Sequence, residues 1–239
     1  SVTDPNGTLE RYSYDVFGRL TKVIGPDDSF ALPTEMYVFQ FNSDHAIAFH
    51  SIRRQSGEAQ TIDSAQFFDG LGRVLQTKTL SGKSGQYILA GQKIFDSFGR
   101  VTRAFNPRAV TTGLSVLDDV DEKTAHIEYE YDERDRLVRK QFQDGTYQSL
   151  EYGIVPQRAE SFISVIDANG HKKRSYSDAL GRVVRIEEYK GADGRFALYP
   201  KQAYAIYATT SYEHDGGNRL LSVRDAKGNL TVMAYDKLG

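Results

Sequence analysis

One seven-residue motif returns along the whole chain, and internal repetition constrains a fold more than any other sequence feature. The motif starts with an aromatic residue and Asp, has Gly three residues after the Asp, and ends in Arg and Leu or Val. The copy Tyr14-Asp15-Val16-Phe17-Gly18-Arg19-Leu20 contains every element. A chain built in this way is expected to repeat one supersecondary structure.

The copies differ in completeness. The copy at Asp178 lacks the aromatic residue, Asp135 and Asn218 stand at the Gly position of two others, and the last copy begins at Tyr235 and stops with the sequence. The motif residues that we expect to have a structural role are Tyr14, Asp15, Gly18, Arg19, Phe68, Asp69, Gly72, Arg73, Phe95, Asp96, Gly99, Arg100, Tyr131, Asp132, Arg136, Asp178, Gly181, Arg182, Asp215, Arg219, Tyr235 and Asp236.

The spacing within the motif predicts a β-hairpin corner. Asp followed three residues later by Gly is typical of a type I turn, in which the Asp side chain accepts hydrogen bonds from nearby backbone N–H groups. A residue in the left-handed conformation then gives a bulge, and Gly takes that conformation without a side-chain clash. Asp135 and Asn218 are residue types that tolerate it better than most.

A second set of Asp-x-x-Gly turns lies between the corners. Asp4, Asp167 and Asp225 each begin one, and a strand-like run such as Leu9-Glu10-Arg11-Tyr12-Ser13-Tyr14 leads from the turn to the next corner. Turn, strand, corner and strand in succession predict an antiparallel β-meander. The predicted fold class is therefore all-β.

The two alternating signals resemble the YD repeat of the Rhs family. Three longer stretches resemble the YD-repeat region of the Tc-toxin B component and of SpvB-like insecticidal toxin proteins. They are Phe105-Asn106-Pro107, the run from Tyr129 to Thr146, and Tyr152-Gly153-Ile154-Val155-Pro156 leading to Asp167-Ala168-Asn169-Gly170. The resemblance covers nearly all of the chain.

The resemblance implies a curved or spiralling sheet that is part of a β-shell. In such proteins the shell encloses a toxic polypeptide, so the implied function is a non-catalytic structural segment. Its partners would be other segments of a parent protein and the enclosed toxin. An extracellular adhesion module that binds carbohydrate or protein through the same repeats is the alternative. Either role implies a bacterial protein that is secreted or on the cell surface.

Composition agrees with a β-rich protein. The chain has 15 Tyr and 13 Phe and no Trp, residue usage that favours strands. A net charge of −2 gives no electrostatic reason to expect nucleic acid as a partner. The absence of Cys excludes disulfides. No apolar run approaches the ~18 residues of a membrane-spanning helix.

We predict that residues 1–239 are one YD/Rhs-repeat region, a fragment of a larger protein, with no internal domain boundary. Three segments depart from the repeat: residues 26–66, the acidic segment 106–123, and residues 187–205. We interpret 106–123 as a loop or short helix.

The candidate chemical sites have simpler interpretations. Asp118, Asp119, Asp121 and Glu122 could bind Ca²⁺, but the spacing of an EF-hand is missing and a solvated loop is favoured. The Asp167 turn lacks the Glu that completes a calcium loop. Five histidines show no metal-binding spacing, and Ser81-Gly82-Lys83-Ser84 lacks the first Gly of a P-loop. We therefore predict no catalytic residues, metal or cofactor.

The motif residues themselves allow two interpretations. In the first, Asp caps the corner, Gly sets the backbone, and Arg pairs with Asp or a neighbouring strand. In the second, rows of Tyr, Asp and Arg bind carbohydrate or a protein. The structural interpretation is favoured because a turn explains every position of the motif except the Arg.

Overall fold

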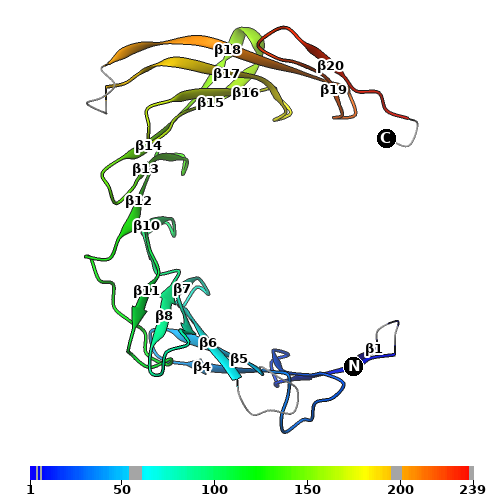
Figure 1. Ribbon diagram of the computed structural model, residues 1–239, viewed down its shortest axis with the longest axis vertical. Coiled ribbons are helices and arrows are strands. Elements are labelled where there is room, and N and C mark those ends of the chain that lie inside the picture. The colour runs from blue at the N-terminus through cyan, green and yellow to red at the C-terminus, as the bar shows by residue number, and fades with distance from the viewer. Residues whose placement is uncertain (4, 6, 54–60, 195–200, 237–239) are drawn as a thin grey trace. The chain divides into compact units, whose positions relative to one another are not determined.

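The chain is described by a computed structural model over residues 1–3, 5, 7–53, 61–194 and 201–236. These residues form antiparallel strands and one short 3-10 turn, η1 (Pro156–Arg158), which confirms the predicted all-β meander (Figure 1). Within the same ranges no helix is long and apolar enough to cross a membrane. The strands belong to two compact units, residues 1–126 and 127–239. The prediction that the chain has no internal domain boundary stays a prediction.

The first unit holds a nine-stranded sheet, in the order β1-β2-β3-β4-β5-β6-β7-β8-β11, and the hairpin of β9 and β10, which does not belong to that sheet. Its strands are β1 (Val2–Thr3), β2 (Leu9–Tyr14), β3 (Leu20–Ile24), β4 (Glu35–Phe41), β5 (Ala46–Arg53), β6 (Thr61–Phe68), β7 (Val74–Leu80), β8 (Tyr87–Ala90), β9 (Lys93–Phe95), β10 (Val101–Phe105) and β11 (Arg108–Val110).

The core of the first unit lies on one face of β5 and β6. Ile47, Ala65 and Phe67 are buried there, and Leu114 and Leu117 of the segment after β11 pack against them. Ile47 and Phe67 are direct cross-strand partners, so their side chains share a face. The segment that departs from the repeat thus covers the sheet, as a loop and not as a helix.

The second unit is a meander in which each strand pairs with the next in sequence. Its strands are β12 (His126–Tyr131), β13 (Leu137–Gln141), β14 (Tyr147–Val155), β15 (Glu160–Ile166), β16 (Lys172–Ser177), β17 (Val183–Ala192), β18 (Gln202–His214), β19 (Leu220–Arg224) and β20 (Leu230–Val232). The pairing of β17 with β18 shifts register after Glu188 and again after Lys190, where the sequence also departs from the repeat.

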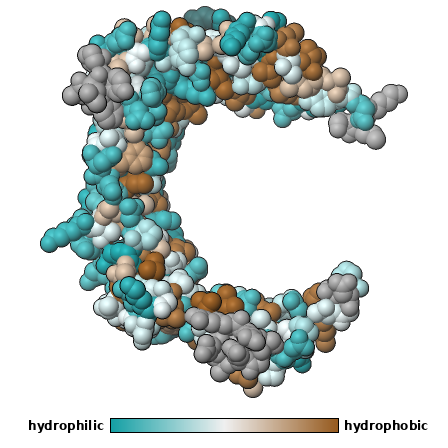
Figure 2. All heavy atoms as spheres, in the orientation of Figure 1, coloured by the Kyte–Doolittle hydropathy of each residue, from teal (hydrophilic) through white to brown (hydrophobic). Residues whose placement is uncertain are grey.

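Much apolar surface stays accessible in both units. Figure 2 shows brown, hydrophobic residues at the surface among teal, hydrophilic ones. Among the described residues the large apolar side chains that remain exposed include Val38, Phe41, Ile154 and Ile163, all on strands. A sheet that keeps apolar side chains uncovered is expected to pack against something else.

Two expectations fall partly outside the described residues. The first concerns the turn that begins at Asp4: Asp4 and Asn6 are not described, although Gly7 of the same turn is left-handed with φ 82°. The second is the end of the last motif copy, residues 237–239.

Candidate functional site: the repeat corners

The six corners that end in Arg share one hydrogen-bonding pattern. At Asp15 the backbone N–H donates to the carbonyl of Arg19, and the Gly18 N–H donates to the Asp15 carbonyl, over 2.9 and 3.0 Å. The carboxylate oxygen Oδ1 of Asp15 accepts the backbone N–H groups of Phe17 and Arg19. The same pair of backbone bonds closes the corners at Asp69, Asp96, Asp132, Asp178 and Asp215.

Each corner contains one residue in the left-handed conformation. Gly takes it in four corners, for example Gly72 with φ 78°, whereas Asp135 and Asn218 take it with φ 59° and 70°. The strand register shifts by a bulge at the residue before the motif aspartate, as between Ser13 and Tyr14. A type I turn followed by a left-handed residue and a bulge is the geometry that the motif spacing indicates.

The arginine is the one motif position that the turn does not explain. Its side chain donates a hydrogen bond to the aspartate of the same corner. The Nε atom of Arg73 donates to Oδ2 of Asp69 over 2.6 Å, and the equivalent bond at Arg136 and Asp132 is 2.8 Å. The Asp carboxylate therefore accepts backbone and guanidinium hydrogen bonds at once. Charge-assisted bonds of this kind are stronger than neutral ones.

These bonds change the acidity of the corner aspartates. Hydrogen bonds from the Arg136 side chain and backbone lower the pKa of Asp132 to about 2. The pKa values of Asp69 and Asp215 are lowered in the same way, chiefly by backbone hydrogen bonds from Arg73 and Arg219. Their shared cause is hydrogen bonding to the ionised form, which favours the carboxylate.

The arginines also reach a later element of the same unit. The guanidinium of Arg73 lies 4.3 Å from the ring centre of Phe95, and that of Arg219 lies 5.1 Å from the ring of Tyr235. Phe95 and Tyr235 are the aromatic residues of the next motif copy. A cation over an aromatic face is attracted by the ring quadrupole. In these two cases the aromatic residue of the later corner supports the arginine of the corner before it.

Hydrogen bonds reinforce the link between corners. The hydroxyl of Tyr235 donates to the carbonyl of Leu220 over 2.8 Å, next to the arginine on which it stacks. Nη1 of Arg182 donates to the carbonyl of Asp215, the first residue of the following corner, over 2.8 Å. The sequence did not predict these two contacts, because each joins residues that lie far apart in the chain.

Tyr152 shows that the aromatic partner does not need to belong to the motif. It lies under Arg136, with 4.5 Å between the guanidinium and the ring centre, and its hydroxyl donates to the carbonyl of Leu137. Tyr235 makes the same two kinds of contact, with Arg219 and the carbonyl of Leu220. The same pair of contacts, a ring against the corner arginine and a hydroxyl bonded to the next carbonyl, therefore occurs at two corners.

The turns without Arg use other side chains in its place. Asp225 accepts the Nδ2–H of Asn229 over 2.7 Å, and its Oδ1 accepts the Asn229 backbone N–H. At Asp167 the partner is the Nδ1 atom of His171, at 3.3 Å. The Asp167 turn, considered above as the start of a calcium loop, is closed by its own hydrogen bonds.

The structure corrects one interpretation of the acidic segment. Asp118 is not solvated: its carboxylate pairs with the ammonium group of Lys78, whose side chain is fully buried on β7. The same ammonium group donates to Thr112 Oγ1 and to the carbonyls of Gly113 and Val116. Lys78 is covered because the segment after β11 folds over it, which sequence periodicity does not reveal.

Two other carboxylates of this segment also have polar partners. Glu122 pairs with Arg103 at 2.6 Å, and Asp121 Oδ1 accepts the backbone N–H of Lys123. Over residues 1–3, 5, 7–53, 61–194 and 201–236, no group of three or more His, Asp or Glu could hold a metal ion.

A second charged cluster lies in the other unit, on β16 and β17. Glu187 is buried and accepts a hydrogen bond from the hydroxyl of Tyr176 over 2.8 Å, and it also pairs with Arg185. Burial opposes ionisation of Glu187, but hydrogen bonds from Tyr189 and Tyr176 and the charge of Arg185 together lower its pKa. A carboxylate held ionised by its neighbours is not a ready proton donor.

Two family models match parts of the chain. A family model described as RHS Repeat matches residues 1–29, and a model described as a domain of unknown function (DUF6443) matches residues 48–153. No curated protein matches the chain.

Solved structures share the fold. The crystal structure of TcdB2-TccC3 matches 94% of this chain with 15% identity and a TM-score of 0.67. The same complex without its hypervariable C-terminal region matches 94% with 12% identity and a TM-score of 0.68. The Tc holotoxin pore of Photorhabdus luminescens matches 77% with 14% identity and a TM-score of 0.55.

The matched segment is a small part of those proteins: 14%, 16% and 10% of their respective chains. At these identities the likeness establishes the fold. Together with the RHS Repeat match and the corner geometry, it confirms the resemblance seen in the sequence. The chain contains an RHS repeat over residues 1–29, and its fold resembles that of Tc-toxin proteins.

Proposed function

We propose that the chain is a non-catalytic wall segment of an Rhs/Tc-like β-shell that encloses a toxin polypeptide. The observation that carries the proposal is the match of 94% of the chain to the TcdB2-TccC3 fold. TcdB2-TccC3 has a hypervariable C-terminal region, and the structure that lacks this region still matches the same share of the chain. In this proposal an equivalent polypeptide is the cargo of the parent protein.

The strand order supports a wall. In the second unit every strand pairs with its sequence neighbours, so the sheet grows by one strand at each turn of the chain. Such a sheet can be extended at either edge by further strands. Contacts such as the hydrogen bond from Arg182 to the Asp215 carbonyl connect successive corners of the sheet.

The polar clusters support a structural role. Lys78 with Asp118 and Glu187 with Tyr176 join strands or loops to each other, as buried charges generally require partners. A wall needs such links and needs no reacting group. The proposal implies that the partners are other segments of the parent protein and the enclosed polypeptide, in a protein secreted by bacteria or held on their surface.

The test is cryo-electron microscopy of the full-length parent protein. A β-shell that contains this segment in its wall and holds additional density inside is the expected result. Strands of this segment that face solvent on both sides, around a filled or extended particle, would contradict it. Glycan-array binding by this chain would then favour the carbohydrate-binding alternative.

A further inference from the structure

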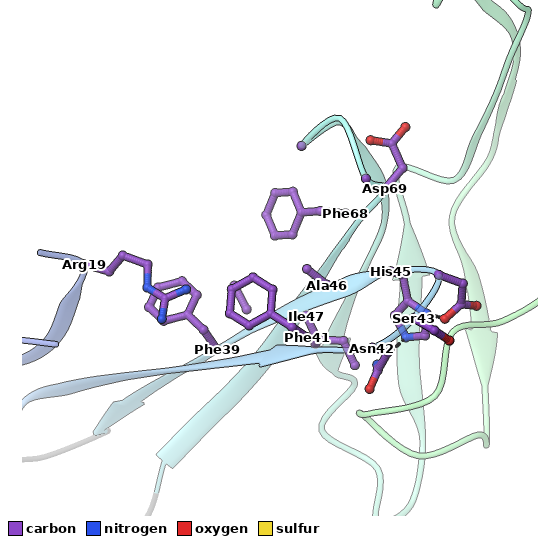
Figure 3. A pocket seen from close by; sticks show the side chains of 14 residues that line it. Arg19, Phe39, Phe41, Asn42, Ser43, His45, Ala46, Ile47, Phe68 and Asp69 are labelled. Carbon is purple, nitrogen blue, oxygen red and sulfur yellow. Dashed lines mark hydrogen bonds and ion pairs between the residues drawn. The ribbon is translucent and has the colours of Figure 1, made fainter. Parts of the chain in front are cut away.

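A slot opens on one face of the first unit between two of its corners. Across β4, β5 and β6 the residues Phe41, Ala46 and Phe68 are direct partners, so all three side chains point to the same face. Neighbouring strands lie about 4.8 Å apart, which puts Phe41 and Phe68 roughly 10 Å apart with only a methyl group between them. The cavity has a volume of about 510 Å³. Figure 3 shows the side chains that line it.

The width of the slot fits one aromatic ring. Stacked rings prefer centre-to-centre distances of about 4.5–7 Å, so a ring above Ala46 would contact both phenyl groups. Ala48 extends the floor of the slot next to Phe39, which is its cross-strand partner. Arg19 closes one end, with its guanidinium 4.6 Å from the Phe39 ring (Figure 3).

Most polar side chains that line the slot already have partners inside the chain. Asn42 Nδ2 lies 2.9 Å from His45 Nε2, and His45 Nδ1 lies 2.8 Å from Asp44. Arg19 pairs with Asp15. A sugar ring would bring hydroxyl groups that need new hydrogen-bond partners. The lining therefore favours an apolar aromatic side chain over a carbohydrate.

The chain itself carries a matching group beside the slot. Val16 and Phe17, the two central residues of the first corner, are 93% and 79% exposed. A type I turn does not require apolar residues at these positions. Arg19 of the same corner lines the slot, so the exposed pair and the slot are neighbours on one surface.

This arrangement is complementary to itself. A two-fold axis would place each Phe17 in the slot of the other copy, which is the reciprocal contact of a symmetric dimer. The charged side chains Arg19 and Asp44 in the lining already pair with Asp15 and His45 of their own chain, so the aromatic contact carries the exchange.

We propose that two copies of this chain associate by exchanging Phe17 between their Phe41–Ala46–Phe68 slots. One phenyl ring buries about 150–250 Å². Two rings and the slot surfaces that they cover thus bury on the order of 600–1,000 Å² of accessible surface. Stable complexes bury ~1,200–2,000 Å². The dimer is therefore weak and reversible. This inference does not depend on the proposed function.

Sedimentation velocity over a concentration series tests the exchange. Phe17→Ser removes the inserted group, and Ala46→Phe fills the slot with a ring from the chain itself. Each substitution should weaken dimerisation at least tenfold, with an unchanged circular dichroism spectrum. Phe98→Ser is the matched control, because Phe98 is the corresponding tip residue of the third corner and is 78% exposed. It should leave the dimer intact.

A fluorescence experiment gives a second measurement. The chain contains no Trp, so Phe17→Trp introduces one reporter. Its emission should shift to shorter wavelength as concentration rises, and should not shift when Ala46→Phe is present. A monomer at every concentration would overturn the proposal, as would equal weakening by Phe17→Ser and Phe98→Ser. A shift caused in dilute Phe17→Trp protein by glucose or galactose would assign the slot to a sugar instead.

Discussion

Arg73 bridges two corners: its Nε atom donates to Asp69 in its own corner, and its guanidinium lies 4.3 Å from the ring centre of Phe95 in the next. Arg219 makes the same two contacts, with Asp215 and Tyr235. Each of these two arginines therefore links its own corner to the next one, through an aromatic partner that its own turn does not contain.

Replacing Arg73 with Lys should destabilise the first unit by about 1 kcal/mol. Lys keeps the positive charge but cannot donate in a fixed fork to Asp69, and it stacks less well on Phe95. Urea unfolding followed by circular dichroism measures the difference. Arg134→Lys is the control, because Arg134 is an exposed residue at the tip of the fourth corner. It should have no measurable effect.

A double-mutant cycle of Arg73→Lys with Phe95→Leu tests the contact between corners. If the two side chains interact, the effects should be less than additive by about 0.5 kcal/mol or more. Strict additivity would mean that the stacking seen in the structure does not contribute to stability.

Gly72→Val and Gly99→Val should both destabilise the chain, by about 1–3 kcal/mol. Both glycines are left-handed, with φ 78° and 83°, and a β-branched residue resists that conformation. A Cβ atom at Gly99 would also lie 3.0 Å from Nη1 of Arg73, so Gly99→Val should have the larger effect. Thermal unfolding of both variants measures this.

Gly72→Asn is the matched control for this experiment. Asn218 occupies the same position of the sixth corner with φ 70°, which shows that the fold accepts Asn there. The cost should be below that of Gly72→Val, because Asn visits the left-handed region more readily. Unchanged melting temperatures for both Val variants would contradict the bulged corner.

Stability should fall as the pH drops from about 4 to about 2. The folded pKa of Asp132 is lowered to about 2, and the pKa values of Asp69 and Asp215 are lowered as well. A carboxyl group whose folded pKa lies below its unfolded pKa of about 3.9 stabilises the fold above that value. That contribution is lost as the pH falls through the folded pKa.

Melting temperatures measured from pH 6 to pH 2 test this window. Asp132→Asn should be less stable at pH 6 and should lose less stability on acidification than the parent chain. Glu133→Gln is the control, since Glu133 is an exposed residue of the same turn. Its acid sensitivity should match that of the parent chain. A melting temperature that is constant down to pH 2 would contradict the role of the corner carboxylates.

The local structure could be predicted from the sequence because the turn is a local device. Asp15, Gly18 and Arg19 lie within five residues, and their bonds connect them to each other. The antiparallel meander followed because consecutive corners leave each strand beside its sequence neighbour. The spacing of Asp, Gly and Arg within each motif was therefore enough to predict the fold class.

Contacts between segments distant in sequence could not be predicted in the same way. Lys78 is paired with Asp118 and buried only because the irregular segment after β11 lies over β7. The slot at Ala46 depends on the register that pairs it with both Phe41 and Phe68. The spacing of corners gives no information about either, since a shift of one residue would place these side chains on opposite faces.

Lys78→Met should destabilise the first unit by about 3–5 kcal/mol, because removing one partner of a buried ion pair leaves the other charge unpaired. The carboxylate of Asp118 would lose its cation, and the carbonyls of Gly113 and Val116 would lose a donor. Adding Asp118→Leu to this variant should recover part of the loss. Lys93→Met, at an exposed position on β9, is the control and should change the unfolding free energy by less than about 0.5 kcal/mol. Equal effects of Lys78→Met and Lys93→Met in urea unfolding would show that the segment after β11 does not cover β7.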